Sequence, residues 1–112
     1  DMYLIFNEAL KCVTVNEIIS MTSYDTVYTD KNGNEKTLSV KNTNQYLAGN
    51  VAAPDRVTVI GGKTGTTSAA GNCLILLARD TSGNPYIAVI LKSAERGILY
   101  TEMNALLKQA TS

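Results

Sequence analysis

The sequence predicts an α+β domain in which helices cover a mostly antiparallel sheet. Three observations lead to this fold class: helical periodicity at both ends of the chain, an alternating pair of short segments before residue 41, and two continuous apolar runs after residue 72. The chain has 112 residues, of which 45% are hydrophobic and 18% charged. It is therefore long enough for one ordinary domain and too short for two.

Two helices are expected at the start of the chain. The first would run from Asp1, as its cap, to about Lys11, because apolar residues recur at helical spacing, at Met2, Ile5, Phe6, Ala9 and Val13. Thr14-Val15-Asn16-Glu17 has the form of a capping box, which predicts a second short helix with Ile18 and Ile19 on its core face.

A β-hairpin is expected next, because the period of the pattern changes to two. Tyr24, Thr26 and Tyr28 alternate with their neighbours, and Asn32-Gly33 separates them from a second extended segment over residues 37–40. Asn-Gly between two alternating segments is typical of a hairpin turn.

The second half of the chain is expected to hold three strands and a helix. A strand over residues 56–60 enters Gly61-Gly62 and continues through Lys63. The apolar runs 73–78 and 86–91 predict a hairpin buried on both faces, with Ser82-Gly83-Asn84 as an ordinary turn between them. The last helix would run from about Arg96 to Lys108, with one stripe of Ile98, Thr101, Glu102 and Ala105 and a second beside it of Leu99, Met103, Leu106 and Leu107.

Composition excludes several classes of function. Ten basic and ten acidic residues leave no net charge to attract nucleic acid or anionic lipid, so neither is an expected partner. The chain has no histidine, which removes imidazole-based catalysis and His-based metal sites, and no cofactor is expected. Cys12 and Cys73 are too far apart for a metal or redox motif and are interpreted as buried thiols. No apolar run is long enough to span a membrane.

Residues 61–67 are the candidate functional segment, because a lysine stands there among glycines and small hydroxyl residues at the end of an apolar strand. Gly62-Lys63-Thr64 matches the last three letters of a phosphate-binding loop. However, Val57 stands where the first glycine of that motif belongs, and a strand follows instead of a helix. A Lys-Thr-Gly active-site strand explains the segment better.

Each residue of this strand suits a peptide ligand that ends in a carboxylate. The Lys63 ammonium would attract the carboxylate, and the Thr64 hydroxyl would donate a hydrogen bond to it. Gly65 has no side chain to prevent a peptide from pairing with the strand. The backbone N–H of Thr66 would donate to the oxyanion of an acyl-transfer step.

The context of this strand closely resembles the D-alanyl-D-alanine carboxypeptidases, the serine low-molecular-mass penicillin-binding family. The resemblance covers essentially the whole chain and includes residues 62–67, the following Ala70-Gly71-Asn72-Cys73-Leu74, a helix with Arg96, and residues 42–47, which resemble an Asn-x-Asn-x-Leu-Leu stretch. It implies the β-lactamase/transpeptidase-like fold, peptidoglycan stem peptides as substrate, β-lactams as covalent inhibitors, and a location in the bacterial cell envelope. It also implies Lys63 and Thr66 as catalytic residues, with Thr64 and Gly65 binding substrate.

The sequence departs from this family in its nucleophile. No serine is followed by a lysine three residues later, so the Ser-x-x-Lys motif of the family is absent from these 112 residues. The chain is therefore expected to be the C-terminal portion of a catalytic domain, with the Ser-x-x-Lys and Ser-x-Asn portion upstream, and to be inactive alone. In this family's fold the strand over residues 86–91 would then have a bare edge, so the chain is expected to dimerise through it.

Two alternative functions stay open at this point. A serine β-lactamase shares the Lys-Thr-Gly strand but needs a water-activating glutamate, and no Glu-x-x-x-Asn stands upstream of the strand. A non-catalytic module could capture peptide carboxylates with residues 63–66 alone. Arg96 could face the substrate or form a surface ion pair with Glu95 or Glu102, and the surface ion pair is favoured.

Overall fold

The structure is a computed structural model that describes residues 1–111. Its elements follow the predicted order of two helices, a hairpin, three strands and a helix, and the α+β fold class is confirmed. They are α1 (Met2–Ala9), α2 (Val13–Ile19), β1 (Ser23–Thr29), β2 (Glu35–Lys41), β3 (Thr58–Thr67), β4 (Gly71–Arg79), β5 (Pro85–Ser93) and α3 (Arg96–Ala110).

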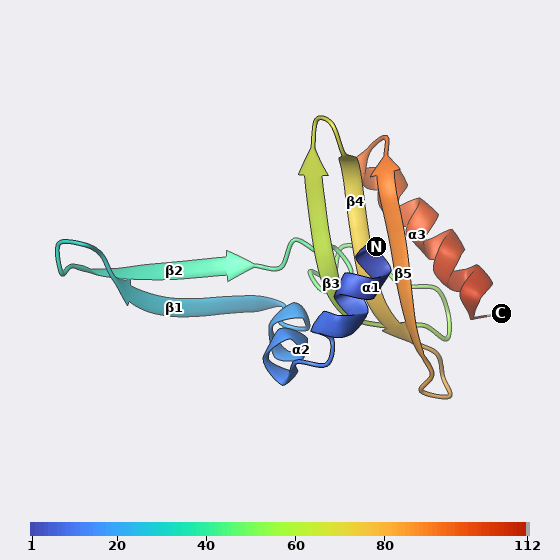
Figure 1. Ribbon diagram of the computed structural model, residues 1–112, viewed down its shortest axis with the longest axis horizontal. Coiled ribbons are helices and arrows are strands. Elements are labelled where there is room, and N and C mark those ends of the chain that lie inside the picture. Colours follow the sequence, from blue (N-terminus) through green and yellow to red (C-terminus); the bar gives the residue numbers. More distant parts are fainter. Residues whose placement is uncertain (112) are drawn as a thin grey trace.

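The body of the molecule is a three-stranded antiparallel sheet in the order β3-β4-β5, with helices on both faces (Figure 1). Side chains alternate along β4, so Leu74, Leu76 and Ala78 pack on the α3 side. Ile75 and Leu77 pack on the other side, with Phe6 of α1. The central strand β4 is therefore buried on both faces, as predicted.

Burial of the hairpin β4–β5 on both faces is confirmed only for β4. In β5 just Ala88 and Ser93 are buried, and 60% of Leu91 is exposed. The reason is position: β4 has a strand on each side, whereas β5 lies at the edge of the sheet.

The second sheet is the hairpin β1–β2, which projects from the body as a two-stranded ribbon (Figure 1). Every residue of β2 is exposed. The projection gives the molecule extents of 54 × 34 × 28 Å.

The same turn closes two hairpins of the chain, β1–β2 and β4–β5. In Asp30-Lys31-Asn32-Gly33-Asn34 and Asp80-Thr81-Ser82-Gly83-Asn84, one carboxylate oxygen of the aspartate accepts the N–H groups two and four residues later, at 2.8–2.9 Å. The glycine lies in the left-handed region, at φ 80° and 83°. Ser82-Gly83-Asn84 is thus part of a hairpin turn, as predicted.

These hydrogen bonds lower the pKa of both aspartates, because they favour the charged carboxylate. For Asp30 the main cause is the backbone N–H of Asn34, and for Asp80 it is the side chain of Asn84, 2.9 Å away. The ionised carboxylates therefore stabilise the turns.

The capping box predicted for the second helix is wrong. Cys12, in an extended conformation, is the N-cap of α2, and Thr14 lies inside the helix. The Asn16 side chain holds the turn before α2 instead, donating to the carbonyls of Leu10 (2.6 Å) and Cys12 (2.9 Å). Asp1 is the N-cap of α1, as predicted, although its side chain makes no capping hydrogen bond, and α1 ends at Ala9, two residues earlier than predicted.

Several predicted core positions are exposed. In α1 only Phe6 is buried, and in α2 Ile19 is half-buried while 59% of Ile18 is exposed. In α3 the buried residues are Leu99, Tyr100, Met103 and Leu107, so the stripe beginning at Ile98 faces away from the sheet. Cys12 is exposed and Cys73 half-buried, both as free thiols, which corrects the interpretation of Cys12 as buried.

Candidate active site

The Lys-Thr-Gly segment lies on β3, a strand at the edge of the sheet. The strand begins at Thr58, two residues later than predicted, because Arg56 has a positive φ of 68° that extended strands do not allow. It stays extended through Thr67, so no helix follows Thr64 and the phosphate-binding loop is excluded.

The three glycines of β3 differ in what surrounds them. A Cβ on Gly61 would lie 2.5 Å from the carbonyl oxygen of Ile19 in α2, and one on Gly62 would collide with the carbonyl oxygen of Ile75 in β4. These two glycines let neighbouring backbones approach. A Cβ on Gly65 would meet nothing within 4 Å, so open space adjoins the strand at that position.

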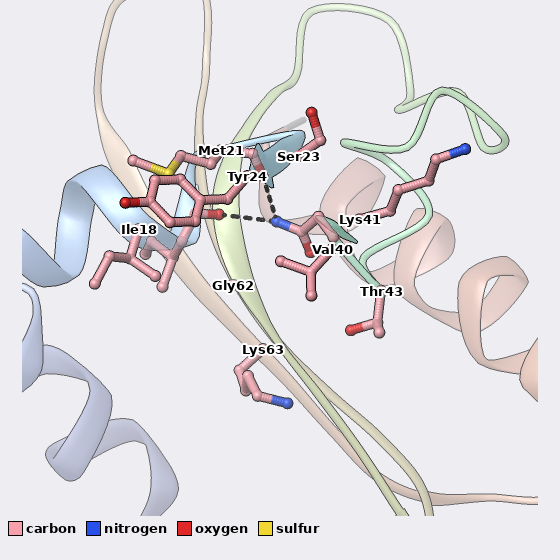
Figure 2. A pocket seen from close by; sticks show the side chains of 11 residues that line it. Ile18, Met21, Ser23, Tyr24, Val40, Lys41, Thr43, Gly62 and Lys63 are labelled. Atoms are coloured by element: carbon pink, nitrogen blue, oxygen red, sulfur yellow. Dashed lines mark hydrogen bonds between the residues drawn. The ribbon is translucent and has the colours of Figure 1, made fainter. Parts of the chain in front are cut away.

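Lys63 is exposed, and its Nζ donates to the carbonyl oxygen of Thr64 at 2.6 Å. Together with Gly62 it borders a groove of about 600 Å³ between β3, α2 and the base of the hairpin (Figure 2). The apolar lining residues of this groove are Ile18, Ile19, Met21, Tyr24 and Val40.

Thr64 and Thr66 lie on the opposite side of the strand from Lys63, as the alternation of a strand requires. They line a second pocket, of about 160 Å³, together with Thr43, Asn72 and Arg96. The hydroxyls of Thr43 and Thr64 are 2.6 Å apart. Of the described residues that line this pocket, Arg96 alone carries a charge, so the pocket is positive.

Asn72 connects the two sides of this pocket. Its side-chain oxygen accepts from the Thr66 hydroxyl (3.3 Å), and its amide donates to the carbonyls of Ser93 (3.3 Å) and Ala94 (3.4 Å), just before Arg96. One side chain therefore links the position of the Thr66 hydroxyl to the start of α3.

Arg96 is exposed, as expected, but the expected ion pair is not formed. Within residues 1–111 the one ion pair joins Lys11 to Glu8, at 2.8 Å, and Arg96 pairs with neither Glu95 nor Glu102. Arg96 is the first residue of α3, where its guanidinium and the positive end of the helix dipole lie at the same pocket.

The segment between the hairpin and β3 is held against α3 by tyrosines. The Tyr46 hydroxyl donates to Asn104 Oδ1 (2.7 Å), its ring packs edge-on against Tyr100 with centroids 5.4 Å apart, and the Tyr100 hydroxyl accepts the N–H of Gln45 (3.2 Å). Burial, followed by the neighbouring Tyr100, raises the pKa of Tyr46 to about 12. This packing carries Thr43 and Gln45 to the rim of the pocket.

A comparison with protein families matches residues 1–95 to the model of the D-alanyl-D-alanine carboxypeptidase family. The chain belongs to this family. The match confirms the resemblance seen in the sequence and favours a carboxypeptidase over the alternative of a β-lactamase. No curated protein matches the chain.

Among solved structures, this carboxypeptidase-family chain is similar to a mutant of the DD-transpeptidase of Streptomyces K15, with a TM-score of 0.74 and 25% sequence identity. The similarity covers 88% of this chain and 36% of that one, so the chain spans about a third of the length of the transpeptidase. The family fold is thus present in the part of the protein described here.

The structure brings together most of the predicted site residues and adds others. Lys63, Thr64, Gly65 and Thr66 lie along one free strand edge, with hydrogen-bond donors on both sides of it. Over residues 1–111 no cluster of His, Cys, Asp and Glu side chains could hold a metal ion. None of the described helices is both long and apolar enough to cross a membrane.

Sequence reasoning weighed Arg96 as a substrate-facing residue but favoured a surface ion pair, and it missed Asn72 and Thr43 as pocket residues. A signal for Asn72 existed, because a tight turn after Thr67 makes Asn72 the register partner of Thr66. No comparable signal pointed to Thr43, and the approach of Arg96 and Thr43 to β3 depends on how α3 and the segment after β2 pack.

Proposed function

We propose that this chain supplies the substrate-binding wall of a D-alanyl-D-alanine carboxypeptidase, and that the small pocket binds the terminal carboxylate of a peptidoglycan stem peptide. The observation that carries the proposal is the convergence of Thr64, Thr66 and Arg96 on one positive pocket beside a free strand edge. A guanidinium binds a carboxylate through two parallel hydrogen bonds, and the threonine hydroxyls are further donors.

The free edge of β3 supports a binding mode in which the peptide pairs with the strand. An extended peptide can add to an exposed sheet edge through main-chain hydrogen bonds. The open space at Gly65 leaves room for it. In this mode the N–H of Thr66 donates to the substrate carbonyl as it becomes an oxyanion, and the Lys63 ammonium adds positive potential.

The proposed reaction proceeds through a serine ester. A serine hydroxyl attacks the carbonyl carbon of the penultimate D-alanine, its proton passes to the amine of the departing terminal D-alanine, and the peptide bond breaks. Water then hydrolyses the ester. The chain has no Ser-x-x-Lys, so the serine and its base must come from outside these 112 residues, and the chain alone is expected to be inactive.

The same proposal gives the expected inhibitor and location. Penicillin would acylate the serine of the whole enzyme, and the substrate places the reaction in the bacterial cell envelope. The test is the intact mass of the native product, isolated from its source with an antibody to this chain and incubated with penicillin.

A polypeptide longer than 112 residues that gains the mass of one penicillin supports the proposal. A native chain of this length with no adduct would leave only a peptide-binding function. An adduct on the 112-residue chain itself would show that the nucleophile has been assigned wrongly.

A further inference from the structure

The side chain of Asn72 holds two segments of the small pocket at once. Asn72 lies near the start of the central strand β4, where the register pairs it with Thr66 of β3 on one side and Ser93 of β5 on the other. Its Oδ1 accepts a hydrogen bond from the Thr66 hydroxyl, and its Nδ2 donates to the carbonyl oxygens of Ser93 and Ala94. Both polar groups of the amide are therefore used, each toward a different neighbouring segment.

This link depends on the chemistry of the side chain and not only on its volume. An asparagine carries an acceptor and a donor on the same branched end. Aspartate, of the same shape, offers acceptors only, and leucine offers neither group. Neither substitute can accept from a hydroxyl and donate to two carbonyls.

Regular strand pairing does not hold the segment before α3. The ladder between β4 and β5 is irregular between Asn72 and Leu74, and Lys92 has a φ of 60°. A Cβ on Gly71 would lie 3.0 Å from the Cα of Lys92, so a glycine there lets the backbone of β4 come close to this segment. Glu95 is the N-cap of α3 and makes no capping hydrogen bond with its side chain. The two bonds that Asn72 donates into the segment therefore restrain the place where α3 begins.

Arg96 follows this segment directly, because it is the first residue of α3. Its side chain is exposed and forms no ion pair within residues 1–111, so no carboxylate of the described chain fixes the guanidinium. The position of the guanidinium then depends on the backbone that carries it. Asn72 ties that backbone to Thr66, on the β3 side of the same pocket.

We propose that Asn72 is a positioning residue of the pocket, which sets the distance from Arg96 to the threonines of β3. This role rests on the proposed function, in which the pocket binds a terminal carboxylate. In a pocket of about 160 Å³ one carboxylate must reach the guanidinium and the threonine hydroxyls together. Paired hydrogen bonds between a guanidinium and a carboxylate need aligned groups, so a shift at the start of α3 weakens them. A site that is already in place also avoids the cost of ordering it on binding.

The lengths of the three bonds favour a positioning role over a stabilising one. They measure 3.3–3.4 Å, beyond the usual range of hydrogen bonds, so each contributes little to the stability of the fold. Together they restrain two segments from one side chain. We therefore expect the loss of Asn72 to change ligand recognition more than stability.

The test compares two peptides that differ only at their C-terminus. One ends in D-Ala-D-Ala with a free carboxylate, and the other is the corresponding C-terminal carboxamide, which has no charge. NMR titration of the chain gives a dissociation constant for each peptide, and the ratio of the two measures recognition of the carboxylate. We expect Asn72→Leu to lower this preference for the carboxylate roughly tenfold, because the bonds from the guanidinium are weakened.

Three further variants make the test specific to positioning. Arg96→Gln removes the group on which Asn72 acts, so adding Asn72→Leu to it should lower the preference no further. Asn7→Leu makes the same change on α1, where Asn7 is exposed and lines neither pocket, and should keep the wild-type preference. Asn72→Thr, whose β-branched side chain suits a strand, repeats the measurement if Asn72→Leu does not fold.

A reduced preference in Asn72→Leu, with no further loss in the double variant, supports the proposal. An unchanged preference overturns it, even where both peptides bind more weakly, and leaves Asn72 as a structural residue. Equal losses in the wild-type and Arg96→Gln backgrounds contradict an action through Arg96. A wild type that binds neither peptide, or does not distinguish them, contradicts the carboxylate pocket itself and overturns the proposed function together with this role.

Discussion

At the scale of single residues, Arg96 decides whether the small pocket is a carboxylate site. Replacement by glutamine removes the one charge of the described pocket lining while keeping two N–H donors. A hydrogen bond to a charged group contributes about 1.5–3 kcal/mol. We therefore expect Arg96→Gln to weaken binding of a peptide ending in D-Ala-D-Ala roughly tenfold to a hundredfold, measured by NMR titration of the chain.

Arg79→Gln is the control for this measurement, because Arg79 is an exposed arginine at the far end of β4 and lines neither pocket. It should bind the peptide as the wild type does. Equal loss in both variants would mean that the peptide senses overall charge and not the pocket.

Because of Tyr46, the stability of the chain should depend on pH in the alkaline range. Its folded pKa of about 12 lies above the ordinary value of 10.0, so folding favours the neutral phenol. That stabilisation is complete below pH 10 and is lost as the pH rises from about 10 to 12. We expect the free energy of unfolding, measured with urea, to fall over this window and to fall less in Tyr46→Phe.

At neutral pH the same variant should lose about 1 kcal/mol, because the hydrogen bond to Asn104 is removed. Parallel curves for the two proteins between pH 10 and 12 would contradict the assignment. The difference between the two curves reports the ionisation of Tyr46 alone, because both proteins share the five other tyrosines of the chain.

At the scale of elements, β3 combines a structural half and a ligand-binding half. Gly62→Ala places a methyl group against the backbone of β4 and should destabilise the fold by about 1–3 kcal/mol. Gly65→Ala meets open space, so its stability should equal or slightly exceed that of the wild type. Urea unfolding followed by circular dichroism measures both.

Peptide binding should separate these variants in the opposite way. The new methyl group of Gly65→Ala adds bulk on the Lys63 side of the strand, beside the edge where a peptide would pair, so binding should fall although the fold is intact. Gly65→Ala with undiminished affinity would place the peptide elsewhere than at the β3 edge.

The elements also show which features the sequence could predict. Their order and type follow from local periodicity and turn residues, and the Lys-Thr-Gly strand from its composition. The sequence left open which face of α3 is buried, because Ile98 and Leu99 are equally apolar and only the position of the sheet decides which of them is covered. The position of Arg96 at the pocket likewise depends on how α3 packs on the sheet, which the sequence does not show.

At the scale of the whole molecule, most buried side chains belong to the sheet β3-β4-β5 and to α3, whereas most side chains of α1, α2 and the hairpin are exposed. Periodicity assigned Met2, Ile5 and Ile18 to a core because a sequence shows which residues are apolar, not what covers them. In the structure these side chains are exposed, with Ile5 at 63%. Burial in α1, α2 and the hairpin is therefore decided by contacts beyond the sheet β3-β4-β5.

Amide hydrogen exchange should reveal this division directly. Amides of β4 should exchange slowest, since β4 is paired on both sides and buried on both faces. Amides of β1 and β2 should exchange fast in dilute solution, because a lone hairpin opens readily. Hairpin amides as slow as those of β4 in dilute solution would show that the ribbon needs no cover.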